Sequence, residues 1–395
     1  MAKSKKTEKK ALKRENGIAS FNLIGEAKIN DFTFKIDDQS EKSSWIYNGL
    51  NLGVDCGEKH GVVYCEMIGG YSADGNNVVY AHGKNPDGSD NFDEQIQVDW
   101  DDRLNPSVME MCGDLSFITV GLEKTDKSKT FYKKFLSAYD AIAYINQHLE
   151  DGMIVNVKGN LRYSSYNDRV QVRKNITSIV LSKVDSADKY MARFTQSILI
   201  NSDSTGLKGD YVDKDKSVIY VNARVLDYVK EINGVDIKGQ FPFNKQFEFE
   251  MDFTKSDICK KIVDKLFKVR KDVTQITFEG DFIEGGAAIT ATLDDIPDDI
   301  KDLIECGVYT EEEALARCSA SGSREQRMVL RRPMIRLVGD EKTPIPQIFH
   351  EKYTEDDLTF DGVAPTNNDD DDAEIDTSST TSTEVDGDMS WLDNL

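Results

Sequence analysis

The chain has 395 residues, 39% of them hydrophobic, and a formal net charge of −22. This length favours two or three domains over one. No apolar run approaches the roughly 18 to 20 residues that span a bilayer, and the basic N-terminus lacks the apolar stretch of a signal peptide. These features argue against membrane and secreted proteins, so we expect a soluble, cytoplasmic protein.

The charge is segregated along the chain. The first 14 residues carry seven Lys or Arg and one Glu, whereas residues 351–395 carry 15 acidic residues and one Lys. A local basic patch can therefore bind phosphate in spite of the overall negative sign. Six cysteines are scattered without a CxxC pair, which indicates reduced core thiols rather than a disulfide framework.

A first domain is predicted over residues 18–184, after a basic disordered arm at 1–17. A segment rich in Gly, Asn and Asp near 72–115 predicts a loop-rich insertion, and apolar residues at three-to-four spacing over 130–152 predict an amphipathic helix. Alternating apolar residues predict strands in the segments 18–36, 45–55, 61–71, 115–123, 153–165 and 169–183. Strands, then a helix, then two strands is the order of a five-stranded OB barrel.

The same order recurs in a second, diverged domain predicted over 190–350. A helix at 256–272 precedes a strand at 273–293, and a helical and basic extension follows. The stretches VNVKGNL (155–161) and ITFEGDF (276–282) share one pattern. The predicted fold is therefore mainly β with α: two OB-like five-stranded barrels in tandem, each with a helix between strands 3 and 4. A disordered acidic tail with an apolar tip is predicted at 354–395.

The strongest candidate for a binding site is the hairpin KGNLRYSSYNDRVQVRK at 158–174. Alternation places Lys158, Asn160 and Arg162 on one strand face. Single-stranded DNA needs this mixture, because cations follow phosphates and aromatic rings stack on unpaired bases. The alternative is a solvent-facing hairpin whose charges keep an edge soluble. The predicted DNA-contacting residues of the hairpin are Lys158, Arg162, Tyr163, Tyr166, Arg169, Arg173 and Lys174.

Three further aromatic residues are stacking candidates, or core residues in the alternative interpretation. Trp45 and Tyr47 share one face of predicted strand 2, and Tyr64 lies on strand 3. A basic run is open to two interpretations, a second phosphate track or a set of partners for the acidic surface and tail. Its members are Arg324, Arg327, Arg331, Arg332 and Arg336.

The acidic tail ends in a short apolar tip. A tryptophan in such a segment is typical of an anchor that docks into a partner's pocket, and the alternative is a tail that only solubilises. The predicted partner-binding residues are Trp391, Leu392 and Leu395.

The stretch KGNLRYSSYNDRVQVRKNITSIVLS (158–182) resembles the final hairpin of OB-fold single-stranded DNA-binding proteins of bacteria and tailed phages. DDDDAEID and DMSWLDNL are similar to their acidic tails. The resemblance covers roughly 18–184 and the tail, and much less of 194–340. The chain departs from the bacterial family in its tandem length and in ending WLDNL rather than Pro-Phe, which favours a bacteriophage or mobile-element type.

The resemblance implies a protein that coats and protects single-stranded DNA without sequence preference during phage-type DNA replication, recombination or DNA repair. The resemblance also implies that such a protein acts in the cytoplasm of the bacterial host. It also implies that Trp391 and Leu392 recruit replication or recombination proteins, such as a polymerase, helicase, primase or recombinase.

Sequence motifs give no sign of catalysis. The four histidines, His60, His82, His148 and His350, are not at metal-ligand spacing, and HExxH, GxSxG and GxxxxGK[ST] do not occur. We therefore expect no enzyme, no cofactor and no metal, although a nuclease-type carboxylate group brought together by the fold stays open. Two alternatives to DNA binding also stay open. One is an OB-fold protein-interaction or assembly component without DNA binding, and the other is a replication accessory protein whose main ligand is another protein.

Overall fold

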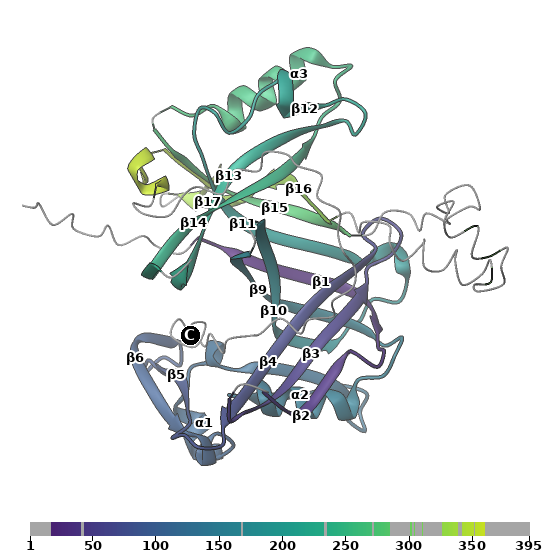
Figure 1. Ribbon diagram of the computed structural model, residues 1–395, viewed down its shortest axis with the longest axis vertical. Helices are drawn as coiled ribbons and strands as arrows, with labels where there is room; N and C mark the ends of the chain where they lie inside the picture. The colour runs from purple at the N-terminus through teal and green to yellow at the C-terminus, as the bar shows by residue number, and fades with distance from the viewer. Residues whose placement is uncertain are drawn as a thin grey trace, which may run out of the picture.

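Figure 1 shows the computed structural model, which is mainly β. The structure describes residues 17–40, 43–166, 169–232, 235–270, 272–284, 301, 304, 310, 326–338, 342–350 and 352–359. Residues 1–16 of the predicted N-terminal arm, most of the predicted helical and basic extension before residue 326, and the tail from 360 lie outside these residues. Among the described residues, no helix combines the length and apolar character needed to cross a membrane.

Five strands of the first half form a closed circuit of backbone pairings. β1 is antiparallel to β3 and β9, β9 to β10, and β3 to β4, while β4 and β10 pair in parallel. The helix α2 (Ala138–His148) lies between β4 and β9 in the chain and packs against β3 and β4. The strands are β1 (Ala19–Lys28), β3 (Trp45–Asp55), β4 (Val62–Ser72), β9 (Ile154–Tyr166) and β10 (Arg169–Leu181).

Five strands of the second half repeat this circuit. β11 is antiparallel to β13 and β15, β15 to β16, and β13 to β14, while β14 and β16 pair in parallel. The helix α3 (Ser256–Ile262) lies between β14 and β15 in the chain. This half occupies the upper part of Figure 1. The strands are β11 (Met191–Ile200), β13 (Val218–Ile232), β14 (Val235–Glu250), β15 (Thr274–Glu284) and β16 (Gln326–Pro333).

A glycine and a phenylalanine occupy equivalent places in the two circuits. Phe21 of β1 pairs with Gly159 of β9, and Phe194 of β11 pairs with Gly280 of β15. A Cβ atom on either glycine would collide with the ring of its phenylalanine and with a backbone carbonyl oxygen of the neighbouring strand, that of Asn175 or Val329. Both rings are at most 3% exposed, so each circuit needs glycine where the ring crosses the strand. The matched glycines of the two sequence stretches thus have one structural cause.

The two circuits are joined edge to edge. β1 pairs antiparallel with β11, and Phe21 lies directly opposite Phe194. The circuits therefore belong to one continuous sheet and share one hydrophobic core. Four cysteines are described, Cys56, Cys65, Cys112 and Cys259, and all are buried and unpaired, as expected for reduced core thiols.

The insertion after β4 is more ordered than its composition predicts. β5 (Val78–Lys84) and β6 (Asp90–Asp99) form a separate two-stranded sheet, and α1 (Pro106–Met111) follows. A small cluster of buried side chains holds this unit together, so the insertion has a core of its own. Its members are Val79, Ala81, Val98, Cys112, Phe117 and Leu136.

The predicted helix at 130–152 is wrong in its first part. Residues Thr130–Phe135 form β8, which pairs with β7 (Ile118–Lys124). The helix begins after Ser137, whose hydroxyl accepts a hydrogen bond from the Tyr139 amide at 3.1 Å. The N-cap therefore places the boundary between strand and helix.

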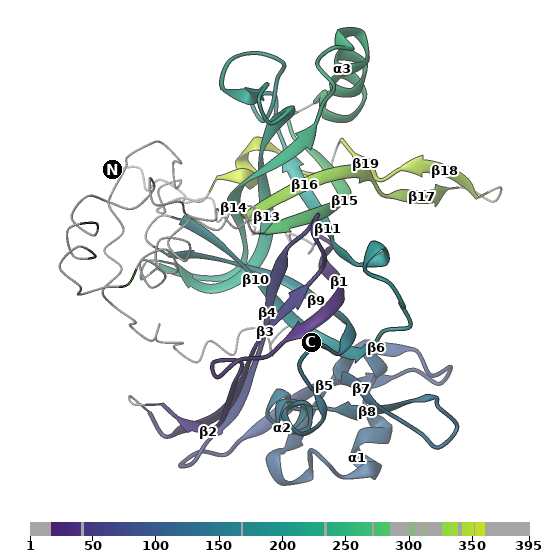
Figure 2. The same cartoon turned by 90° about the vertical axis from the view of Figure 1, so that its right-hand side faces the viewer.

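The remaining elements are short. β17 and β18 form a hairpin that projects from the second circuit (Figure 2). The other strands are β2 (Phe34–Gln39), β12 (Val212–Asp213), β17 (Ile335–Val338), β18 (Thr343–Pro346) and β19 (Ile348–Phe349). The other helical turns are η1 (Trp100–Asp102), η2 (Asp114–Ser116), η3 (Ala187–Lys189), η4 (Gly209–Tyr211), η5 (Val263–Phe267) and η7 (Glu355–Leu358).

Candidate nucleic-acid interface

The β9–β10 hairpin is docked on the second circuit at Tyr163. Tyr163 is 4% exposed, its hydroxyl donates to Gln196 Oε1 at 2.8 Å, and its ring packs against Phe243 with centroids 6.3 Å apart. The prediction that Tyr163 stacks on DNA is therefore wrong for this structure. β9 continues to alternate beyond Leu161, so residue 163 faces inward, and β14 of the second half covers it.

Two predicted cations of the hairpin have acidic partners on the second circuit. Lys174 is 7% exposed and lies 2.5 Å from Glu284, so the prediction that Lys174 contacts DNA is also wrong for this structure. The Arg162 guanidinium lies 3.3 Å from Asp227 Oδ2. Burial raises the pKa of Asp227, and Arg162 opposes that rise. These residues of the hairpin therefore make contacts between the two circuits.

Arg173 and Lys158 remain accessible. Arg173 lies 3.7 Å from Glu66, and both side chains are more than 40% exposed. Such an exposed ion pair contributes about 0–1 kcal/mol, so a phosphate can compete for the arginine at little cost. Lys158 is exposed on the outer face of β9, as alternation predicts. The side chains of Tyr166 and Arg169 and the tail residues Trp391, Leu392 and Leu395 lie outside the described part of the chain.

The outer face of β3 and β4 carries the three aromatic candidates. Leu50, Leu52 and Val54 point into the core, so the alternation of β3 turns Trp45 and Tyr47 outward. Their rings stack, with centroids 4.7 Å apart and planes inclined by 11°. Both side chains, and that of Tyr64 on β4, are partly exposed. The interpretation of these rings as core residues is therefore wrong.

Small residues and a lysine surround this aromatic pair. Tyr47 lies opposite Gly70 of β4 and two residues from Gly49, so no bulky neighbour covers its ring from these positions. Lys35 of β2 places its ammonium 5.9 Å from the ring centroid of Tyr47. The Tyr47 hydroxyl donates to Asp38 at 2.8 Å, which lowers the pKa of that carboxyl. Lys35 was missed in the sequence because β2 is short and weakly patterned.

The basic run on β16 and β17 pairs with carboxylates. Arg327 contacts Glu248 at 2.5 Å and Arg332 contacts Glu279 at 2.5 Å. Arg331 contacts both Glu250 and Asp281. The interpretation as partners of the acidic surface holds for these three arginines. Arg336 lies over the Phe349 ring at 4.6 Å, and Arg324 is outside the described residues.

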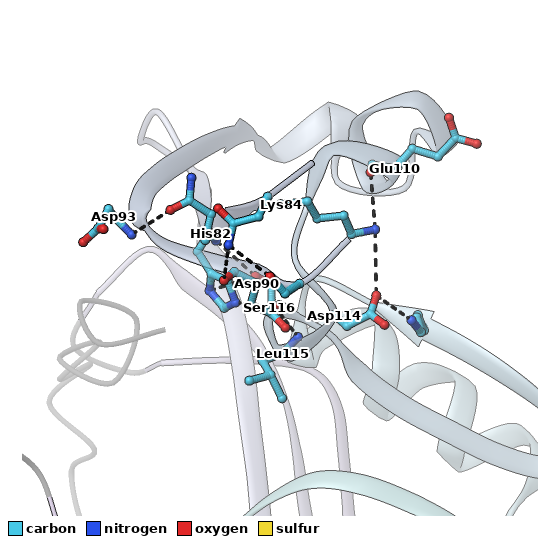
Figure 3. A network of polar contacts seen from close by, with 12 residues as sticks. His82, Lys84, Asp90, Asp93, Glu110, Asp114, Leu115 and Ser116 are labelled. Atoms are coloured by element: carbon cyan, nitrogen blue, oxygen red, sulfur yellow. Dashed lines mark hydrogen bonds and ion pairs between the residues drawn. The ribbon is translucent and has the colours of Figure 1, made fainter. Parts of the chain in front are cut away.

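A Ser–His–Asp network in the insertion has the residue types of a hydrolytic triad (Figure 3). The His82 ring contacts Asp90 through Nε2 at 2.8 Å and Ser116 Oγ through Nδ1 at 3.1 Å. In a catalytic triad the histidine contacts the serine hydroxyl through Nε2 and the carboxylate through Nδ1, and the hydroxyl is accessible. Here the two nitrogens are exchanged, and Ser116 is 4% exposed and accepts a hydrogen bond from the His82 backbone N–H. Asp90 also accepts the Leu115 amide, which lowers its pKa. This geometry suits a clamp that holds the insertion together.

The described residues contain no group of three or more His, Cys, Asp or Glu side chains arranged to hold a metal ion. Comparison with known proteins gives two findings. Residues 115–278, which span parts of both circuits, match a protein-family model described as YorF. A crystal structure of a deletion mutant of the single-stranded DNA-binding protein from Thermus aquaticus is similar over 81% of this chain and 96% of that chain, with 9% identity and a TM-score of 0.30. No curated protein matches the chain.

Proposed function

We propose that the chain binds single-stranded DNA without sequence preference, and without catalysis, on the outer face of β3, β4 and β10. The two strand circuits support an interpretation as tandem OB-like barrels. When the five strands of each circuit are numbered in chain order, the third and fifth strands are parallel, the first pairs with the second and fourth, and a helix precedes the fourth. OB barrels bind oligonucleotides on the face of strands 2 and 3, which are β3 and β4 here.

The stacked, outward-facing pair of Trp45 and Tyr47 carries this proposal. A base that continues their stack gains about 1–3 kcal/mol, whatever its identity. Lys35 stands beside the Tyr47 ring, in an exposed ion pair with Asp38 at 3.6 Å for which a phosphate can compete at little cost. Arg173 contacts Glu66, which lies four residues from Gly70 along β4, roughly 13 Å. A strand of a few nucleotides therefore reaches both the rings and Arg173.

Contacts between cationic side chains and phosphates make this binding sensitive to salt. Cationic contacts release counterions from the nucleic acid, so the affinity should fall steeply as salt rises. The acidic residues from 351 onward hold much of the negative charge and lie at one end of the chain, away in sequence from β2, β3, β4 and β10. The apolar tip with Trp391 and Leu392 is proposed to recruit replication or recombination proteins, in the manner of the bacterial and phage proteins it resembles.

The direct test is a salt titration of oligo-dT binding to the full chain and to Trp45→Ala. Loss of one stacked base predicts a decrease in affinity of about 5- to 150-fold. Tyr132→Ala is the matched control, because Tyr132 is 57% exposed on β8, outside the proposed face. Equal affinity of Trp45→Ala and Tyr132→Ala would reject the site. Absence of oligo-dT binding at low salt would reject the function in favour of an interaction or assembly component.

Removal of residues 369–395 separates the two proposed activities. We expect DNA affinity to be unchanged or higher, because the acidic residues no longer compete with DNA for cationic side chains. The same deletion should abolish co-purification of replication proteins with the chain. Retention of these partners after the deletion would contradict the role proposed for Trp391 and Leu392.

A further inference from the structure

Lys245 lies on the apolar face of β14. Alternation along this strand puts it on the same face as Phe243 and Phe247, which are at most 1% exposed. Its register partner on β13 is Ala223, which is fully buried. Lys245 itself is half-buried, so its ammonium is partly desolvated and an anion beside it would be stabilising.

A polar cavity of about 260 Å³ contains this lysine. It lies between the two circuits, with Val170 of β10 on one side and residues of β14 and β16 on the other. The residues Asn244, Gln246 and Gln326 also line it. The volume is roughly that of nine water molecules at about 30 Å³ each, enough for one phosphate group.

The charges around the cavity leave Lys245 uncompensated. Arg327 in the wall is paired with Glu248 at 2.5 Å, and the neighbouring Lys174 is paired with Glu284 at 2.5 Å. Among the described residues, no carboxylate lies within ion-pair distance of Lys245. Burial, with a smaller effect of the charge of Lys174, lowers the pKa of Lys245. The site therefore has one excess positive charge.

We propose that this cavity binds one phosphate group through Lys245. The ammonium has three N–H donors for the phosphate oxygens, and such charge-assisted bonds are strong. The phosphate comes either from a nucleic-acid backbone or from a free phosphate ion. A phosphate from the DNA backbone is a source that rests on the proposed function. In that case the bound DNA strand would pass over the cavity between the two circuits.

Thermal unfolding of the full chain tests binding of the ion itself. Inorganic phosphate should raise the Tm of the wild type over that in chloride of equal ionic strength, because a ligand of the folded state stabilises it. Lys245→Met should lose this rise, and its Tm without phosphate should exceed that of the wild type because an unpaired charge is gone. Lys189→Met, at an exposed turn, removes the same charge and should retain the phosphate effect.

The salt dependence of oligo-dT binding identifies the source. If Lys245 holds a strand phosphate, Lys245→Met should reduce the slope of log K against log salt by about 0.7. Lys245→Arg should restore the slope, and Lys189→Met should leave it unchanged. An unchanged slope together with a lost Tm effect assigns the cavity to a free phosphate ion.

If Lys245→Met changes neither the slope of log K against log salt nor the rise in Tm with phosphate, the proposed phosphate site is wrong. The Trp45→Ala measurement keeps the proposed function separate. If Trp45→Ala loses affinity while Lys245→Met behaves as wild type, the function stands and the cavity has no part in it.

Discussion

Replacing Lys174 with Met leaves Glu284 as an unpaired carboxylate in a site where its side chain is 5% exposed. Removing one partner of a buried ion pair costs about 3–5 kcal/mol. The Lys174 ammonium also lies 4.9 Å from the ring centroid of Phe282, and that contact is lost too. We therefore expect the free energy of unfolding to fall by about 3–5 kcal/mol, a large part of the roughly 5–15 kcal/mol typical of a folded domain.

A double-mutant cycle measured by urea denaturation tests this value. Lys174→Met with Glu284→Met should recover most of the loss, because replacing a whole buried pair by apolar side chains is often neutral. Lys189→Met breaks the exposed pair with Asp185 and should cost at most about 1 kcal/mol. A Lys174→Met variant within about 0.5 kcal/mol of the wild type would show that the hairpin is not docked through this pair.

Three further predictions concern other contacts. Tyr163→Phe should lower the free energy of unfolding by about 1–3 kcal/mol through loss of a buried hydrogen bond and leave oligo-dT affinity unchanged; a fall in affinity with unchanged stability would return Tyr163 to the DNA site. Gly159→Ala should cost about 1–3 kcal/mol, whereas Gly239→Ala, whose added Cβ would meet only the Ile237 carbonyl oxygen at 3.7 Å, should be tolerated; equal urea midpoints would contradict the close packing around Gly159. The pKa of Asp90 is lowered, so the stabilisation that this carboxylate provides is present above the usual pKa of about 3.9 and is lost as the pH falls through the lower folded value. Asp90→Asn should therefore flatten the acid dependence of Tm and speed hydrogen exchange at the Leu115 amide. Unchanged exchange at Leu115 would refute the clamp.

The sequence predicts local order well where a strand has one buried face. The alternation of β9 correctly turns Lys158 and Arg162 outward and Val157 and Leu161 inward. The predicted helix at 130–152 also ends too late, because α2 ends at His148 and Gly152, with φ +78°, lies in the turn that leads to β9. The recurrence of strands, helix and strands predicts the order of the two circuits, because each element carries its own periodicity.

The errors arise where distant segments meet. The charged and aromatic composition of the β9–β10 hairpin favours a solvent-exposed site, but β13 and β14 supply Asp227 and Phe243 to cover it. The alternation of side chains along each strand already indicates that Tyr163 and Lys174 face inward. Tyr163 lies on the same strand face as Leu161, and Lys174 lies on the same face as Val170 and Val172. No local pattern predicts which second surface packs on the hairpin, so that contact required the structure.

The fluorescence of Trp45 tests the central claim most directly. In a chain with Trp100→Phe and Trp391→Phe, Trp45 is the one remaining tryptophan. A base stacked on its ring should quench this emission as oligo-dT is added at low salt, and added salt should reverse the quenching. Oligo-dT that binds this chain without changing the emission, or that does not bind at all, would contradict a single-stranded DNA site on the outer face of β3 and β4.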